Sequence, residues 1–212
     1  RREDASRVGY EYFVLTAAHT VRNILADQGD KSFVLITVFQ GGAAKEIRAS
    51  PLSDDALFDI ALVKFSSPEI LNIAEPASEE DFRRAGIFTP VYTVGCPLGL
   101  NPYPTRGEIA SINALADGKR FFMITAPVYY GNSGGGVFLA ENQKLIGIFS
   151  KVQTSSARYG GQAITHMGYV VPLNAIVDWL RKCGYGFIMG EPESKPDSRP
   201  VAEPILLPEG KR

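Results

Sequence analysis

The segment Gly131-Asn132-Ser133-Gly134-Gly135-Gly136 contains the residue types that most directly suggest chemistry. A serine hydroxyl that attacks a carbonyl needs backbone N–H groups that converge on the developing oxyanion, and glycines allow the tight turn that places them. On its own, such a segment more often marks an ordinary glycine-rich hairpin, because isolated short motifs are frequent false positives. A catalytic interpretation therefore needs a base and an acid elsewhere in the chain.

A candidate base follows the apolar run Val14-Leu15-Thr16-Ala17-Ala18, where His19 ends a strand-like segment. A histidine with small neighbours can turn its imidazole towards a cleft, and its near-neutral pKa suits both accepting and returning a proton. The alternative is a structural histidine whose ring is satisfied inside the fold. The other histidine, His166, lies in a polar stretch, and we assign it to the surface or the rim of a pocket, without a catalytic role.

The candidate acid is Asp59, which directly precedes the apolar run Ile60-Ala61-Leu62-Val63. A carboxylate at this position costs desolvation unless a partner satisfies it. A histidine Nδ1–H would be such a partner, and the contact would fix the imidazole tautomer and stabilise the imidazolium. Asp54 and Asp55 compete for the same role, but we interpret Ser53-Asp54-Asp55 as a solvated turn.

In the order histidine, aspartate, serine, these three residues resemble the triad of trypsin-like serine proteases of the chymotrypsin fold, and the chain is most similar to the HtrA-like (Deg-type) branch. The resemblance implies that Ser133 is the nucleophile, His19 the general base and Asp59 its orienting partner. It also implies an oxyanion hole formed by the backbone N–H groups of Gly131 and Ser133. The similarity covers roughly residues 9–182 and includes further family-like segments at residues 94–100, 107–111, 145–148 and 168–173.

The same resemblance indicates where a peptide would bind. The edge at Phe149 to Lys151 would pair with an extended substrate as an added β-strand. The substrate-binding residues implied in this way are Pro127, Ile148, Phe149, Ser150, Lys151 and Gly168. Six residues before the nucleophile, where enzymes that cleave after lysine or arginine carry an acid, this chain has Pro127. We therefore expect small or medium apolar residues before the cleaved bond.

Activation by a newly cut N-terminus is not expected. In zymogen-type relatives a freed terminal amine pairs with an aspartate immediately before the nucleophile. The residue at this position is Asn132, which carries no charge, and the chain contains no sequence resembling the activating IVGG terminus.

Short β-rich runs alternate with turn signals along the chain, which is typical of an all-β fold. The resemblance implies two six-stranded Greek-key barrels in a protease domain over residues 1–190, with barrel one at about 1–78 and barrel two at about 85–172. A helix is expected at about 173–183, and a single helical turn could open residues 18–26. The first strand of barrel one has no counterpart in residues 1–8, so we expect it upstream of Arg1. Expected strands cover residues 9–16, 32–40, 46–52, 60–65, 90–94, 107–113, 121–125, 135–139, 145–151 and 168–171.

Composition fits a globular enzyme and limits its partners. The 212 residues are 45% hydrophobic and 21% charged, enough for a sizeable core in one domain or two small ones. The net charge of −1 gives no indication of a nucleic-acid partner. No apolar run approaches the roughly 18 residues of a membrane span. Residues 191–212 are proline-rich and predict an extended tail or linker, whose one apolar patch is Ile205-Leu206-Leu207.

The two cysteines, Cys96 and Cys183, are too few for a disulfide framework and are interpreted as free thiols. Neither suggests a catalytic cysteine, and the cysteines and histidines show no metal-ligand spacing, so we expect neither metal nor cofactor. No export signal is visible in this stretch, which leaves a cytoplasmic and a periplasmic location open. Assembly into a homo-oligomer is open as well.

Two functions of different classes fit these features. The first is a serine endopeptidase that acts on protein or peptide segments in extended form. The second is a catalytically silent member of the same fold that serves as a binding module or scaffold. Such a member would usually lack a triad residue, and all three are present here. A viral-type cysteine protease on this fold is excluded by the serine at position 133.

Overall fold

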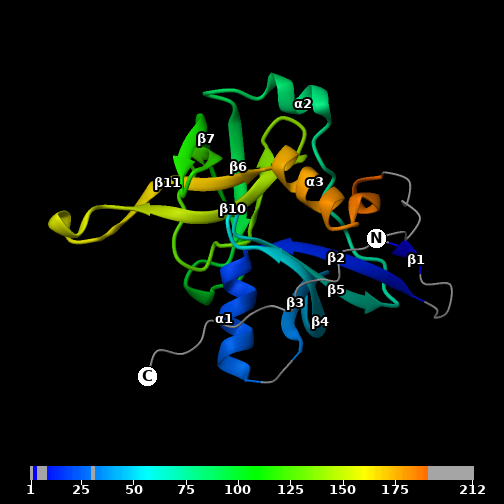
Figure 1. The fold of residues 1–212 in the computed structure, drawn as a ribbon. Helices are drawn as coiled ribbons and strands as arrows, with labels where there is room; N and C mark the ends of the chain where they lie inside the picture. The colour runs from blue at the N-terminus through cyan, green and yellow to red at the C-terminus, as the bar shows by residue number, and fades with distance from the viewer. Residues whose placement is uncertain (1, 4–8, 30–31, 191–212) are drawn as a thin grey trace.

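The computed structural model describes residues 2–3, 9–29 and 32–190, and these residues form two β-sheets with three α-helices at their margins (Figure 1). Every strand pair within the sheets is antiparallel. The proline-rich tail expected over residues 191–212 lies outside the described residues.

The first sheet has five strands in the order β1-β2-β5-β4-β3. Helix α1, Ala18–Gln28, leaves it directly after β2 and packs its buried residues Ala18, Val21 and Leu25 against the sheet. The strands are β1 (Arg2–Glu3), β2 (Tyr10–Thr16), β3 (Val34–Gln40), β4 (Ala43–Asp55) and β5 (Ile60–Ser67).

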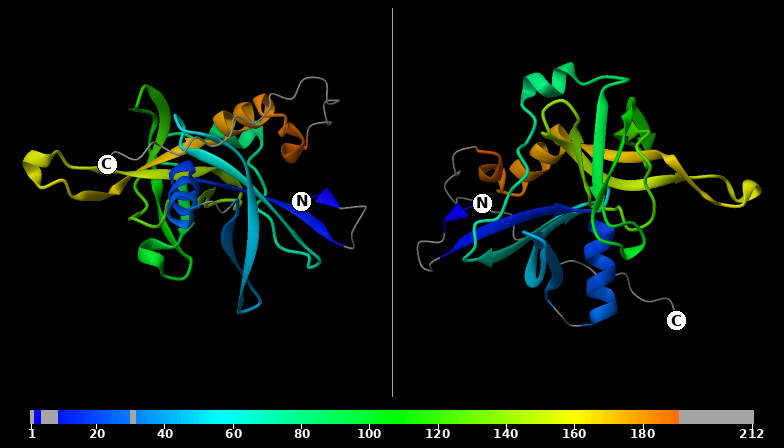
Figure 2. Two further views of the ribbon diagram at one scale, coloured as in Figure 1. Left: turned by 60° about the horizontal axis from the view of Figure 1, so that its bottom comes forward. Right: turned by 180° about the vertical axis from the view of Figure 1, so that it is seen from behind.

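The second sheet is a closed six-stranded barrel in the order β10-β11-β8-β7-β6-β9. The hairpin of β10 and β11 extends far beyond the barrel, as all views show (Figures 1 and 2). Together with the first sheet, this barrel confirms the expected all-β fold. The strands are β6 (Pro90–Gly95), β7 (Tyr103–Ala116), β8 (Lys119–Ile124), β9 (Gly136–Leu139), β10 (Leu145–Thr154) and β11 (Ala163–Pro172).

Strand β5 joins the two halves because it is buried on both faces. Ile60 and Leu62 enter a core shared with the barrel, whereas Ala61 and Val63 enter the core of the first sheet. This arrangement explains why the strand reads as a continuous apolar run and does not alternate between apolar and polar residues.

Helix α3, Leu173–Lys182, seals the shared core from outside. It matches the helix expected at 173–183. Short 3₁₀ turns complete the description: η1 (Pro97–Gly99), η2 (Ala157–Tyr159) and, after α3, η3 (Gly186–Met189).

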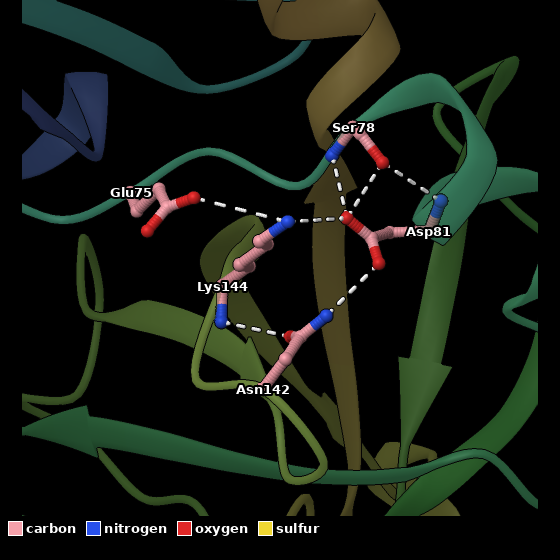
Figure 3. A network of polar contacts seen from close by, with 5 residues as sticks. All are labelled: Glu75, Ser78, Asp81, Asn142 and Lys144. Carbon is pink, nitrogen blue, oxygen red and sulfur yellow. Dashed lines mark hydrogen bonds and ion pairs between the residues drawn. The ribbon is translucent and has the colours of Figure 1, made fainter.

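The connection between the two halves contains a helix that we did not expect, α2 (Glu79–Arg84). Its start is a capping box: the Ser78 hydroxyl accepts from the Asp81 amide at 3.1 Å, and the Asp81 carboxylate accepts from the Ser78 amide at 2.9 Å. Lys144 Nζ lies 3.0 Å from Asp81 Oδ2, and Asn142 Nδ2 donates to Asp81 Oδ1 at 2.9 Å (Figure 3). The hydrogen bond from the Ser78 hydroxyl is the largest cause that lowers the pKa of Asp81. This network ties the connection to the β9–β10 turn.

Two further expectations about local structure were wrong. Residues 18–26 contribute to a helix of 11 residues and not to one turn. Ser53, Asp54 and Asp55 end strand β4 and do not form a solvated turn. Asp54 is nearly buried and forms an ion pair with Arg22 of α1.

The outer edge of the first sheet is only partly covered by the described residues. Strand β1 lies within residues 1–8, where no first strand was expected, and it pairs with Tyr10 and Glu11 alone. Residues 12–16 of β2 have no paired strand on that side among the residues described. A groove of about 470 Å³ runs between this edge and β3, and Ile188 and Met189 of η3 also line it.

Candidate active site

The candidate site begins in the turn between β4 and β5, which places Asp59. The Asp55 carboxylate accepts the backbone N–H groups of Leu57 at 2.8 Å and Phe58 at 3.0 Å, and so holds the turn closed. Asp59 follows with a positive φ of 58°, a conformation that aspartate tolerates better than most residues. The turn directs its side chain towards the start of α1.

Helix α1 has no side-chain cap of its own at Ala17, and Asp59 supplies the missing acceptors. The Ala18 N–H donates to the Asp59 carbonyl oxygen at 3.2 Å, and the His19 N–H donates to Asp59 Oδ1 at 2.9 Å. A carboxylate at a helix N-terminus also interacts favourably with the helix dipole. His19 is thereby fixed in the first turn of α1.

The imidazole of His19 meets the same carboxylate. His19 Nδ1 lies 2.8 Å from Asp59 Oδ2, and the Ser150 hydroxyl donates to that oxygen, also at 2.8 Å. Ser150 is fully buried and sits at a β-bulge in β10, between Phe149 opposite Val170 and Lys151 opposite Tyr169. A bulge re-aims side chains, which accounts for a strand residue pointing at the acid.

These contacts raise the pKa of His19 and lower the pKa of Asp59, and both shifts favour the charged form of each side chain. The hydrogen bond to Asp59 raises the pKa of His19, against the opposing effects of burial and of the nearby Lys151 charge. Burial alone would raise the pKa of Asp59, but hydrogen bonds from the His19 ring, the His19 amide and Ser150 together lower it. The carboxylate is therefore ionised at neutral pH, and the imidazole is a stronger base than a free histidine.

The loop that carries Ser133 packs against the strand end that leads to His19. A Cβ placed on Gly134 would lie 2.8 Å from the Ala17 amide nitrogen and in conflict with Thr16 Oγ1, so only glycine permits this approach. Gly134 also has a positive φ of 87°. No hydrogen bond joins Ser133 to His19 within the described part of the chain. The structure thus brings the serine loop beside the histidine without showing a completed triad.

Two amides of this loop have no hydrogen-bond acceptor among the described residues. The amides of Asn132, Gly134 and Gly135 donate to the carbonyls of Tyr129, Phe149 and Asn132, respectively, at 2.8–3.1 Å. Within the ranges that the structure describes, the N–H groups of Gly131 and Ser133 have no such acceptor. Gly131, with φ 97°, lies so close to the 96–98 backbone that an added Cβ would meet the Cys96 oxygen at 2.5 Å.

The residues expected to bind substrate fall into different places. Phe149 and Gly168 lie together, since a Cβ on Gly168 would meet the Phe149 ring and Val128 at 2.9 Å each. Pro127 is exposed beside Val128, and its carbonyl accepts from Thr105 at 2.7 Å. Ile148 instead packs in the core shared by the two halves. Ser150 contacts Asp59, a role that the sequence did not reveal, and the charge of Lys151 acts to lower the pKa of His19.

The remaining candidate groups lie outside this arrangement. His166 is exposed, and its Nδ1 lies 2.9 Å from the Thr125 carbonyl oxygen. Cys96 and Cys183 are free thiols, and burial raises the pKa of Cys96. Among the described residues, no group of three or more His, Cys, Asp or Glu side chains could hold a metal ion. In the same part of the chain, no helix has the length and apolar character needed to span a bilayer.

This fold, with an Asp-His pair beside a glycine-rich serine loop, is that of a trypsin-like peptidase. A family model of the trypsin-like peptidase domain matches residues 5–148, and the chain belongs to this family. The matched residues include His19, Asp59 and Ser133. A comparison with curated proteins finds no match.

Solved structures of HtrA-type proteases share the fold. One is the HtrA-type protease AlgW with a decapeptide, with a TM-score of 0.64 and 18% sequence identity over 80% of this chain and 47% of the other. A second is an AlgW variant with a tripeptide, with a TM-score of 0.60 and 22% identity over 84% of this chain and 52% of the other. This chain thus spans about half the length of these two neighbours.

Proposed function

We propose that the protein is a serine endopeptidase in which Ser133, His19 and Asp59 act as the catalytic triad. The observation that carries this proposal is the hydrogen bond between His19 Nδ1 and Asp59 Oδ2 at 2.8 Å, located beside the loop of Ser133. Asp59 fixes the tautomer that leaves His19 Nε2 as the proton acceptor, and its charge stabilises the imidazolium that forms.

In the proposed reaction Ser133 Oγ attacks a peptide carbonyl while His19 takes the hydroxyl proton. His19 then returns this proton to the leaving amine, and water hydrolyses the acyl-enzyme by the same route. The N–H groups of Gly131 and Ser133 would bind the oxyanion of each tetrahedral intermediate. Their lack of acceptors among the described residues supports this assignment.

We also propose that this oxyanion hole does not depend on a freed N-terminus. The residue before the nucleophile is Asn132, which is buried and uncharged. Its Oδ1 accepts the Tyr129 N–H at 3.4 Å, so the loop supplies a partner for this side chain. A terminal amine would find no counter-ion there.

The substrate is proposed to be a protein or peptide segment in extended form. Both neighbours named above were solved with bound peptides. In this chain, Phe149 is hydrogen-bonded on this edge to Gly134 and Gly135, and from Ser150 onward the edge of β10 has no strand beside it opposite β11 among the described residues, so a peptide could pair there.

Casein hydrolysis by the wild type and by Ser133→Ala tests the proposal. Loss of the nucleophile should lower kcat by about 10⁴-fold or more while the thermal midpoint stays unchanged, because only a hydroxyl is removed. Ser66→Ala, which changes an exposed serine on β5, is the matched control and should retain full activity. Equal, measurable rates for the wild type and Ser133→Ala would refute the triad, whereas no hydrolysis by either protein would favour the scaffold function.

A further inference from the structure

Two lysines, Lys119 and Lys151, each contact one ring of an aromatic pair. One ring of this pair belongs to the residue before Asp59. The rings of Phe58 and Phe121 meet edge to face, with centroids 6.1 Å apart, and Phe58 directly precedes Asp59 in the chain. Lys119 Nζ lies 5.0 Å from the Phe58 ring centroid. Lys151 Nζ lies 5.5 Å from the Phe121 ring centroid. Cation–π contacts at these distances restrain both ammonium groups near the site.

Lys151 connects this group directly to the proposed machinery. It follows Ser150, the residue that binds the Asp59 carboxylate, and its charge opposes protonation of His19. Its ammonium forms an ion pair with Asp117, whose side chain is 70% exposed at the β7–β8 turn. The ion pair therefore lies open to solvent, where a ligand carboxylate could compete with Asp117 or join it.

The carboxylates nearest to the aromatic pair in sequence are already occupied. Asp55 accepts the Leu57 and Phe58 amides, Asp59 holds His19, and Asp54 pairs with Arg22. Within the part of the chain that the structure describes, no carboxylate lies within ion-pair distance of Lys119. Lys119 therefore has no carboxylate partner among the described residues, and Lys151 has only the exposed Asp117.

The strand geometry would place a peptide bound along β10 beside Lys151. On one side, β10 pairs with β11; on the other, its pairing with β9 ends at Ile148 opposite Gly136. Phe149 still exchanges backbone hydrogen bonds with Gly134 and Gly135, so the free edge begins at Ser150 and includes Lys151. A peptide that pairs antiparallel with this edge, with its reacting carbonyl at Ser133, runs past Lys151 with the residues that precede the cleaved bond.

We propose that Lys151 and Lys119 form a specificity site that selects an aspartate or glutamate two to four residues before the cleaved bond. This inference rests on the proposed peptidase function and adds a substrate class to it. The ligand group is a carboxylate on an extended peptide, bound by charge and by the hydrogen bonds of the ammonium groups. The Asp117 carboxylate competes with the substrate carboxylate for the Lys151 ammonium group.

Matched quenched-fluorescence peptides test this selection. Each pair carries valine before the cleaved bond and differs only by glutamate or glutamine at the second, third or fourth position before it. Exposed ion pairs contribute modestly, so we expect kcat/KM to be about two- to five-fold higher for glutamate at one of these positions. This ratio should fall towards one at high ionic strength, since salt screens charges beyond a few ångströms.

Three variants separate charge selection from a merely structural effect. Lys151→Gln and Lys119→Gln should each reduce the glutamate-to-glutamine ratio, whereas Asp117→Asn should increase it by removing the competitor. A structural role would instead lower the rates for both peptides of a pair in all three variants. Lys45→Gln is the matched control, because Lys45 forms an exposed ion pair with Glu69 in the other sheet and should leave the ratio unchanged.

Failure of this inference can be told apart from failure of the proposed function. If a fluorophosphonate labels Ser133 and the peptides are cleaved with equal kcat/KM for glutamate and glutamine at all three positions, the lysine site is wrong and the peptidase stands. A higher ratio in both lysine variants than in the wild type would also overturn it. If Ser133 is neither labelled nor active, the proposed function itself fails, and with it the substrate class.

Discussion

At the scale of single residues, Asp59 has two structural tasks that reinforce one another. Its carbonyl and one carboxylate oxygen accept the first N–H groups of α1, while the other carboxylate oxygen faces the His19 ring and Ser150. The same side chain thus fixes where the helix starts and how the imidazole is oriented. Replacing it affects local folding as well as proton transfer.

The first prediction concerns the protonation of His19. The contact with Asp59 raises the pKa of His19 above its ordinary 6.5, so the neutral, base-competent ring is lost as pH falls through that raised pKa. The contact stabilises the fold fully below pH 6.5, and this stabilisation is lost as pH rises through the raised pKa. Proton NMR of inactive Ser133→Ala should show His19 titrating above 6.5.

The control for this titration is Asp59→Asn in the same inactive background. It removes the negative partner, so the His19 pKa should decrease. The chain has only two histidines, and His166→Gln assigns the resonances. A His19 pKa that is the same with and without the Asp59 carboxylate would contradict the account.

The second prediction concerns the residue immediately before the cleaved bond. Gly168 is enclosed by Phe149, Val128 and Ile124, all of them apolar and nearly inaccessible to solvent. A lysine or arginine entering beside them would lose hydration without gaining a counter-ion. A peptide-library profile should therefore favour small or medium apolar residues at this position by more than about tenfold over basic ones. Dominance of lysine and arginine in the profile would contradict it.

At the scale of elements, the site depends on close backbone approaches between loops. The turn that presents Ser133 reaches the end of β2 through Gly134, and it contacts residues 96–98 through Gly131. Both glycines have positive φ, which allows the loop to turn and also allows its backbone to touch its neighbours. The glycines position the serine, and they do so by lacking a side chain.

Gly134→Ala should therefore impair catalysis more than stability. The left-handed conformation costs alanine about 1 kcal/mol, and the added Cβ would press on the Ala17 amide nitrogen, which cannot rotate away. Displacing Ser133 by about 1 Å should lower kcat/KM by about 100-fold. Peptide kinetics measures the loss of kcat/KM, and thermal unfolding measures the loss of stability.

The matched control is Gly160→Ala at the tip of the β10–β11 hairpin. Gly160 has a similar φ of 89°, but an added Cβ meets nothing nearer than Gln162 at 3.9 Å. It should lose only the roughly 1 kcal/mol of stability that backbone strain costs and keep its kcat/KM. Equal catalytic losses in both variants would show that backbone strain, and not the approach to Ala17, is responsible.

Most strands could be predicted from the sequence, because the buried residues of a strand form a recognisable pattern of apolar positions. The expected strands at 9–16, 60–65 and 90–94 agree with β2, β5 and β6 to within two residues. The strand expected at 168–171 extends back to residue 163, because the outer part of the β10–β11 hairpin is held by strand pairing and shows little apolar alternation. Helix α2 could have been recognised from Ser78 and Asp81, a capping-box spacing.

The pairing of His19 with Asp59 could also be predicted, because a carboxylate before an apolar strand needs a partner. The role of Ser150 could not, since it depends on a bulge that the sequence does not signal. The burial of Asp54 was missed for a similar reason: its partner, Arg22, comes from a helix that the sequence indicated only as a single turn. The burial and the partners of Ser150 and Asp54 depend on tertiary contacts, which the sequence pattern does not show.

At the scale of the whole molecule, the site is assembled from both sheets. His19 and Asp59 come from the first half, while Ser133 and Ser150 come from the barrel, and β5 and α3 pack in the core between them. Any change that shifts one half against the other would separate the serine from its base. The core shared by the two halves, which contains Ile60 and Leu62 of β5 and the buried face of α3, restrains this shift.

This assembly leads to a prediction about activation. Asn132 holds the serine loop without a charged partner, so an uncleaved N-terminal extension should not reduce the number of active sites. Active-site titration with a fluorophosphonate, before and after proteolytic removal of such an extension, measures this number directly. Labelling that appears only after removal would contradict the proposed independence from a freed N-terminus.

The central claim is that Ser133 is a nucleophile activated by His19. Its most direct test is to map the site of fluorophosphonate labelling by mass spectrometry in the wild type, Ser133→Ala and His19→Ala. We predict a single adduct on Ser133 in the wild type, none in Ser133→Ala and a labelling rate reduced by at least about 1,000-fold in His19→Ala. The absence of an adduct in the wild type, or an adduct on another residue that persists in Ser133→Ala, would contradict the account.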